Sequence, residues 1–159
     1  MVTTIQRTVI LLEDGTEGNA YDFVGKFSKG FAKVRLKEHY GYINDKGEEV
    51  IQVKYDCVSD FAGGFTKVEL EGKYGYINKK GEEVIPVKYD WGSDFVGGFT
   101  KVKLEGKYGY INEKGEEVGQ IKYDEVYNFT NGFAKVELEG KYGYINEKGE
   151  EVIPTVLYG

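Results

Sequence analysis

The chain has 159 residues, of which 40% are hydrophobic and 30% are charged, so it can bury a core within a single domain. Its formal net charge is -6, and charges of both signs are mixed along its length, so no basic stretch is available to contact a nucleic acid backbone. The chain has a single cysteine, Cys57, which excludes an internal disulfide framework. It has no run of about 18 apolar residues, so we expect no membrane insertion.

The first predicted element is a β-hairpin over residues 9–21. Its segment Asp14-Gly15-Thr16-Glu17 corresponds to Lys46-Gly47-Glu48-Glu49 further along the chain, but two residues are missing before Tyr21. Terminal units of repeat proteins are commonly atypical, because they cover the end of a stack. We therefore predict a partial capping repeat at the N-terminus, over residues 1–20.

From Tyr21 to Val152 the sequence repeats every 34 residues without an insertion. The segment Tyr-Gly-Tyr-Ile-Asn occurs once in each copy and begins at Tyr40, Tyr74, Tyr108 and Tyr142. Residues 68–84 and 136–152 are identical except at Lys79, which corresponds to Glu147. We predict one continuous repeat domain of four repeats, the last of which includes a C-terminal cap: residues 21–54, 55–88, 89–122 and 123–159.

The third repeat illustrates the elements expected in each copy. Its mixture of β-branched, aromatic and charged residues predicts three strands, over residues 99–104, 107–112 and 116–121. Glu105-Gly106 suits a tight hairpin turn, and Gly115 suits the turn before the third strand. A short fourth strand is considered around residues 125–128, in the crossing to the next repeat. No segment has helical spacing over three turns, so we expect almost no helix.

The predicted strands are apolar on both faces. Tyr76 and Ile77 are neighbours, and neighbouring residues of a strand point to opposite sides of a sheet. Such sheets require covering on both sides, which stacking of repeat upon repeat provides. We predict an all-β fold in which antiparallel three-stranded repeats of 34 residues stack in an open solenoid-like array. A small β-propeller, closed by the N-terminal hairpin, is the alternative, although 34 residues is short for a four-stranded blade.

The order and spacing of these motifs resemble a known family. The block from Gly106 to Val118, followed by Tyr123-Asp124 and by Phe129 with Gly132-Phe133, is similar to the bacterial WG β-repeat family. One departure is systematic, because the tryptophan of the family motif is tyrosine here, at Tyr40, Tyr74, Tyr108 and Tyr142. The resemblance implies a β-repeat array with an interaction role, and it implies no general catalytic activity.

No group of residues suggests a reaction. His39 and Cys57 each lack a partner with which to form a catalytic or metal site. The pairs Asp56/Asp60 and Asp90/Asp94 are not kept in the other repeats, which favours turn capping over a carboxylate site. We predict no enzyme, no catalytic residue, no metal site and no cofactor.

Positions that vary between repeats are better candidates for binding than positions that do not. The tyrosines that recur in every repeat favour packing, with a stripe for sugars or peptides as the alternative. One set of positions that vary between repeats lies in the segment that connects each repeat to the next. An exposed tryptophan in this segment would be a natural contact residue. The predicted binding residues are Trp91, Phe23, Cys57, Glu125 and Tyr127.

The sequence favours a non-enzymatic repeat module for protein–protein interaction or structural scaffolding. The alternatives are a carbohydrate or cell-wall binding module that uses the tyrosine rows, and an engineered or consensus-like repeat chain without a ligand. Another protein is the expected partner, a carbohydrate is a possible one, and the terminal repeats offer edges for self-association. The first eight residues contain no signal-peptide core, so the location is unknown and cytoplasmic by default.

Overall fold

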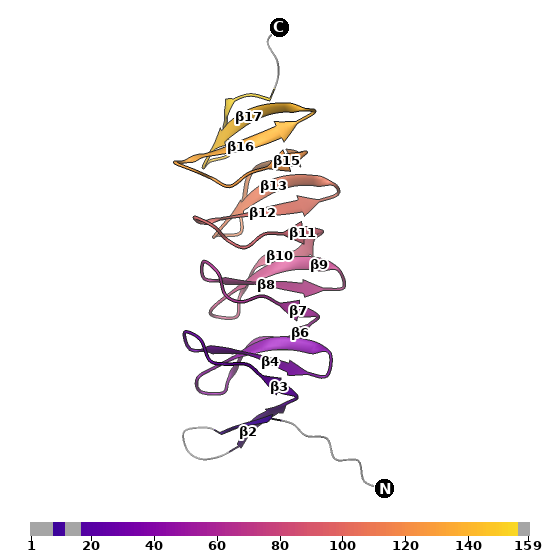
Figure 1. Cartoon of the computed structure of the whole chain (residues 1–159), viewed down its shortest axis with the longest axis vertical. Helices are drawn as coiled ribbons and strands as arrows, with labels where there is room; N and C mark the ends of the chain where they lie inside the picture. Colours follow the sequence, from indigo (N-terminus) through magenta and orange to yellow (C-terminus); the bar gives the residue numbers. More distant parts are fainter. Residues whose placement is uncertain (1–7, 12–16, 156–159) are drawn as a thin grey trace.

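The computed structural model of the chain describes residues 8–11 and 17–155. All regular elements among them are β-strands, arranged as a hairpin followed by four antiparallel sheets of four strands. No helix that could cross a membrane is present in these residues. Figure 1 shows the sheets stacked one above another along the long axis, with the N-terminal hairpin at one end and the fourth sheet at the other. The open stack is therefore confirmed, and the sheets do not close into a ring.

The hairpin pairs β1 (Thr8–Leu11) with β2 (Glu17–Tyr21). The first sheet contains β3 (Phe23–Val24), β4 (Phe31–Leu36), β5 (His39–Asn44) and β6 (Glu49–Tyr55). The second contains β7 (Cys57–Val58), β8 (Phe65–Leu70), β9 (Lys73–Asn78) and β10 (Glu83–Tyr89). The third contains β11 (Trp91–Gly92), β12 (Phe99–Leu104), β13 (Lys107–Asn112) and β14 (Glu117–Tyr123). The fourth contains β15 (Glu125–Val126), β16 (Phe133–Leu138), β17 (Lys141–Asn146) and β18 (Glu151–Ile153).

Each sheet has one strand more than the three-stranded repeat predicted from the sequence. The additional strand contains only two residues, and in the fourth sheet it covers Glu125–Val126, within the segment considered for it. Two residues are too few to show an alternating pattern, so the sequence does not predict this strand clearly. In the structure its backbone pairs with the neighbouring long strand. The predicted strands over 99–104 and 107–112 have the bounds of β12 and β13.

A glycine in the middle of each Tyr-Gly-Tyr segment allows the third long strand to bulge. In the second sheet Tyr74 is opposite Tyr89 while Tyr76 is opposite Ile85, so the register shifts between the two pairs. The bulge passes close to Gly75, where an added Cβ would lie 2.7 Å from the carbonyl oxygen of Ile85. This close approach of two backbones explains why each copy has glycine there.

The core lies between the sheets, in one cluster for each junction. At the junction of the first and second sheets, Tyr42 and Ile51 pack against Val58, Val68 and Ile77, and all five are buried. Equivalent clusters fill the next two junctions. Stacking therefore covers both faces of the interior sheets, as their two-sided apolar pattern requires.

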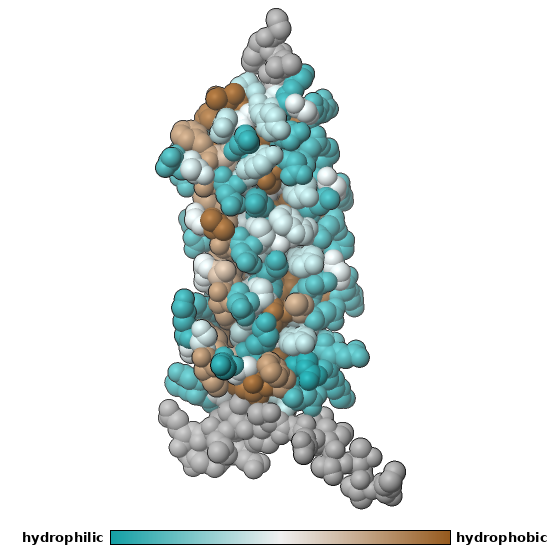
Figure 2. All heavy atoms as spheres, viewed as in Figure 1, coloured by the Kyte–Doolittle hydropathy of each residue, from teal (hydrophilic) through white to brown (hydrophobic). Residues whose placement is uncertain are grey.

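The two ends of the stack differ. Below the first sheet, Tyr21 of the hairpin packs with Ala32, Val34 and Ile43, and all four are buried. The upper face of the fourth sheet is open in the described residues: Phe133, Tyr142, Tyr144, Val152 and Ile153 are 39–54% exposed. Figure 2 shows hydrophobic residues on the surface at this end of the stack. The predicted turn at Asp14-Gly15-Thr16 lies outside the described residues, as do residues 1–7 and 156–159.

Candidate functional site

The predicted binding positions form a column along one side of the stack. Phe23, Cys57, Trp91 and Glu125 are the first residues of the short strands β3, β7, β11 and β15, which lie one above another in Figure 1. All four are exposed, and Phe23 and Trp91 retain 46% and 39% of their accessible surface. Tyr127, two residues after Glu125, is 39% exposed. Residues far apart in the sequence thus share one surface, and their role in binding stays a prediction.

Each column residue belongs to a rung of three side chains on one face of its sheet. Directly paired residues of antiparallel strands project to the same side, so the pairing defines the rung. In every rung a variable residue of the short strand lies opposite a second variable residue, which lies opposite a tyrosine. The four rungs are Phe23–Arg35–Tyr40, Cys57–Glu69–Tyr74, Trp91–Lys103–Tyr108 and Glu125–Glu137–Tyr142.

The third rung is an aromatic and cationic cluster. The rings of Trp91 and Tyr108 lie 5.9 Å apart at 76°, an edge-to-face arrangement. The ammonium group of Lys103 lies 5.2 Å from the centre of the Tyr108 ring, within the range of a cation–π interaction. These contacts hold Trp91 in place while more than a third of its surface stays accessible, as suits an interface anchor.

A cation lies between two rings beside the fourth rung. The ammonium group of Lys135 lies 4.6 Å from the ring centre of Tyr127 and 5.1 Å from that of Tyr142. The carboxylates of Glu125 and Glu137 are the variable positions of this rung, where the third rung has Trp91 and Lys103. The third and fourth rungs therefore carry side chains of different charge and type on the same arrangement of paired strands.

The inner tyrosine row is a packing element. Tyr42, Tyr76 and Tyr110 are 4%, 1% and 1% exposed, so these rings do not form a continuous stripe on the surface for a sugar or a peptide. Burial is the largest effect on the Tyr42 phenol and, with the nearby Asp60 carboxylate, raises its pKa to about 12. The outer row of Tyr40, Tyr74 and Tyr108 is only partly buried and stays accessible at the column.

The aspartates of the Tyr-Asp pairs cap turns. Asp56 accepts a 2.8 Å hydrogen bond from the backbone N–H of Glu71, and Asp90 accepts one of 2.9 Å from Glu105. Both donors are turn residues with positive φ, at 52° and 51°. The ammonium group of Lys73 also donates to Asp90, and this is the largest cause of the lowered pKa of the Asp90 carboxyl. The expected capping role is therefore present.

No group of three or more His, Cys, Asp or Glu side chains that could hold a metal ion occurs within residues 8–11 and 17–155. His39 and Cys57 are both exposed, and Cys57 is a free thiol. The structure thus brings together the column residues, while His39 begins β5 of the first sheet and Cys57 begins β7 of the second.

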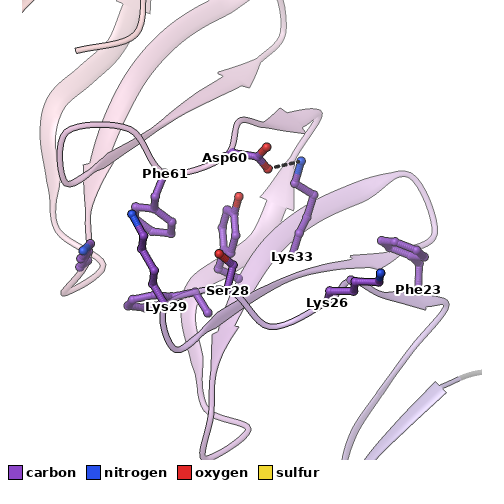
Figure 3. A pocket seen from close by; sticks show the side chains of 11 residues that line it. Phe23, Lys26, Ser28, Lys29, Lys33, Asp60 and Phe61 are labelled. Carbon is purple, nitrogen blue, oxygen red and sulfur yellow. Dashed lines mark ion pairs between the residues drawn. The ribbon is translucent and has the colours of Figure 1, made fainter. Parts of the chain in front are cut away.

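Sequence reasoning missed a basic pocket at the junction of the first and second sheets. Its volume is about 450 Å³. Lys29 and Phe61 lie at one end and Lys26 and Phe23 at the other, with Lys33 and Asp60 between them (Figure 3). The signal was present in the sequence, because Lys26 and Lys29 correspond to aspartate and glycine in the next two repeats. It was missed because the lining residues come from separate segments that meet only in the stack.

One family model matches the consecutive repeats of this chain. The model described as WG containing repeat matches residues 40–74, 74–108, 108–142 and 142–157. The chain belongs to the WG containing repeat family. Each match starts at a tyrosine of the outer row, which is where the sequence differs from the tryptophan of the motif.

Two further comparisons describe the chain's place among known proteins. No curated protein matches it. Among solved structures it is similar to "KlHsv2 with loop 6CD replaced by a Gly-Ser linker", with 14% sequence identity and a TM-score of 0.44 over 77% of this WG repeat chain and 47% of that chain. The chain therefore spans about half the length of that structure.

Proposed function

We propose that this WG repeat stack is a non-enzymatic module that binds another protein along the column of variable residues. The family is not a known enzyme family and suggests a repeat module for binding or scaffolding. The observation that carries the proposal is the alignment of variable residues along the stack. The first residues of the short strands change between copies and are exposed, whereas Tyr42, Tyr76 and Tyr110 of the inner row recur and are buried.

The geometry of the column favours an elongated partner. Stacked sheets lie about 10 Å apart, and an extended peptide rises about 3.3 Å per residue. A peptide that runs along the stack would therefore meet a new rung roughly every three residues. The rungs would select different side chains, since the first offers Phe23 and Arg35, the third Trp91 and Lys103, and the fourth two glutamates.

Cys57 provides a direct test, because it is the single cysteine of the chain and is exposed in the middle of the column. A library of displayed random peptides would be selected on the whole chain, and the chain would then carry a photo-crosslinking maleimide at Cys57. We expect selected peptides to crosslink at this position. We also expect Trp91→Ala to weaken them about tenfold or more, as for an aromatic anchor.

Val96→Ala is the control, because Val96 is an exposed apolar residue of the same repeat as Trp91, at 52%, and lies outside the column. The control should leave binding of the selected peptides unchanged. Peptides that bind Trp91→Ala as tightly as the parent chain and do not crosslink at Cys57 would show that the column is not the binding surface.

A further inference from the structure

We infer that the pocket between the first and second sheets binds an acidic segment of a partner protein, with an apolar side chain in the pocket and carboxylates on its lysines. The identity of the ligand as a protein segment rests on the function proposed above. The pocket itself rests on independent observations of shape and charge. It touches the column at one residue, Phe23, so a partner on the column reaches it directly.

The floor of the pocket is apolar. Phe31 and Phe61 lie with their ring centres 4.9 Å apart at 36°, and Phe61 lies 4.9 Å from Tyr42. At the next two junctions the equivalent phenylalanine pairs are closer and more parallel: Phe65–Phe95 at 4.2 Å and 19°, and Phe99–Phe129 at 4.2 Å and 28°. The rings at the first junction are therefore splayed, and they form a surface on which an aromatic or aliphatic side chain can pack.

The rim of the pocket is basic. Four lysines line it, Lys26, Lys29, Lys33 and Lys79, against a single carboxylate, Asp60. Asp60 pairs with Lys33 at 3.7 Å, and its own side chain is almost fully exposed, so this ion pair is weak. No ion pair is present for the other three lysines within the described part of the chain. Three lysines without an ion pair among the described residues thus line an apolar hollow.

This charge is specific to one junction out of three. The positions of Lys26, Lys29 and Lys79 hold Asp60, Gly63 and Glu113 at the second junction, and Asp94, Gly97 and Glu147 at the third. The lysine equivalent to Lys33 is kept, as Lys67 and Lys101. Lys79 is also the one position at which residues 68–84 depart from residues 136–152. Three lysines thus replace glycine or an acidic residue of the other junctions, and they line one pocket although Lys79 is distant from the other two in the sequence. We take this as an indication that they share a ligand.

Lys29 is placed at some conformational cost. Its φ is 53°, in the left-handed region, where the second and third repeats have Gly63 and Gly97. A residue with a Cβ is less stable than glycine in that conformation by about 1 kcal/mol. The basic side chain is therefore present despite a local preference for glycine, which agrees with a role in binding.

The charge distribution of the whole chain favours an anionic ligand at this end. Residues 23–55 contain seven lysines and arginines against four acidic residues, whereas residues 125–153 contain three against six. The chain as a whole is acidic, so the first sheet is a positive region within a negative protein. Such a field steers an acidic segment toward the first junction and away from the fourth sheet.

The test uses fluorescence anisotropy with the full chain and a labelled peptide in which a phenylalanine is flanked by glutamates on both sides. We expect saturable binding that weakens as salt is added. Lys79→Glu should weaken it about fivefold to tenfold, because an attraction becomes a repulsion at the rim. This variant should fold, since Glu147 occupies the same place in the fourth repeat. Lys80→Glu is the matched control: it makes the same charge change on the same turn outside the pocket, and should leave affinity within about twofold.

Several outcomes would overturn the inference. Equal weakening by Lys79→Glu and Lys80→Glu would mean that only the overall charge matters. If a peptide with glutamines in place of the glutamates bound equally well, the lysines would not be required for binding. Phenylacetate that binds as tightly as the peptide would point to a free acid instead of a protein segment. Because these variants leave Trp91 and Cys57 intact, failure here is distinguishable from failure of the column, which the Cys57 crosslink reports.

Discussion

The hydroxyl of Tyr76 in β9 donates a 2.5 Å hydrogen bond to the backbone carbonyl of Ser93, which follows β11 in the next sheet. It also accepts a 2.8 Å hydrogen bond from the buried hydroxyl of Thr100. Tyr42 makes the same contact with the carbonyl of Ser59 one repeat earlier, and Tyr110 with that of Tyr127 one repeat later. A buried tyrosine hydroxyl in each of the first three sheets therefore helps to fix how that sheet sits on the next.

Tyr76→Phe should destabilise the chain by about 1 kcal/mol, because it removes the hydrogen bond donated to the Ser93 carbonyl and one acceptor of the buried Thr100 hydroxyl, which also donates to that carbonyl. Tyr144→Phe is the matched control, since Tyr144 occupies the same position in the fourth sheet but is 39% exposed. Chemical denaturation of both variants measures the difference. An equal effect of the two substitutions would show that the buried hydroxyl does not hold the junction together.

Phe95→Ala should cost about 3–5 kcal/mol, because it leaves a cavity beside Phe65 and Tyr76. Phe95 is 6% exposed, and its ring stacks on Phe65 and meets Tyr76 edge-on. Phe27 holds the same position in the first repeat but is 49% exposed, so Phe27→Ala should change stability by less than about 0.5 kcal/mol. Thermal and denaturant unfolding of the pair tests this, and a large loss in Phe27→Ala would contradict the described packing.

Gly75→Ala should destabilise the second sheet by about 2–3 kcal/mol, because the added methyl group would meet the backbone of β10. The nearest atoms are the Ile85 carbonyl oxygen at 2.7 Å and the Val87 Cα at 2.8 Å, and neither can move without shifting the bulge. Lys80→Ala, on an exposed turn after the same strand, is the control. Unchanged unfolding of Gly75→Ala would mean that the bulge is not fixed by this contact.

The stability of the fold should fall as the pH rises through the range of about 10 to 12. Burial raises the pKa of Tyr42 to about 12 from a usual value of 10.0, and it also raises the pKa of Tyr76 and Tyr110. A group whose pKa is higher in the folded state contributes its full stability below the unfolded pKa, and loses it as the pH rises through the folded pKa. Urea unfolding at a series of alkaline pH values should show this decline. A free energy of unfolding that stays constant over the window would rule it out.

Much of the fold was accessible from the sequence. The 34-residue period, the long strands, the glycine turns and the requirement for stacking were all predicted, because they depend on local conformational preference and on apolar residues on both faces of a strand. Tyr76 and Ile77 carried that argument, and both are buried, at 1% and 2%. The column of Phe23, Cys57, Trp91 and Glu125 was also accessible, since an undisturbed repeat aligns equivalent positions.

Other features required the folded chain. The sequence did not separate the inner tyrosine row, which is buried, from the outer row, which stays partly exposed, although both recur at the same period. It also did not reveal that Lys26, Lys29 and Lys79 line one pocket, since Lys79 lies in the turn after β9 of the second sheet and the other two lie between β3 and β4 of the first.

The sequence by itself therefore determined the repeat, its strands and its turns, because each depends on interactions between residues close together in one copy. The tertiary structure decided which side chains of a copy are buried by its neighbour and which charges meet across a junction. These outcomes depend on the register between sheets, which is set by long-range contacts such as that of Tyr76 with Ser93.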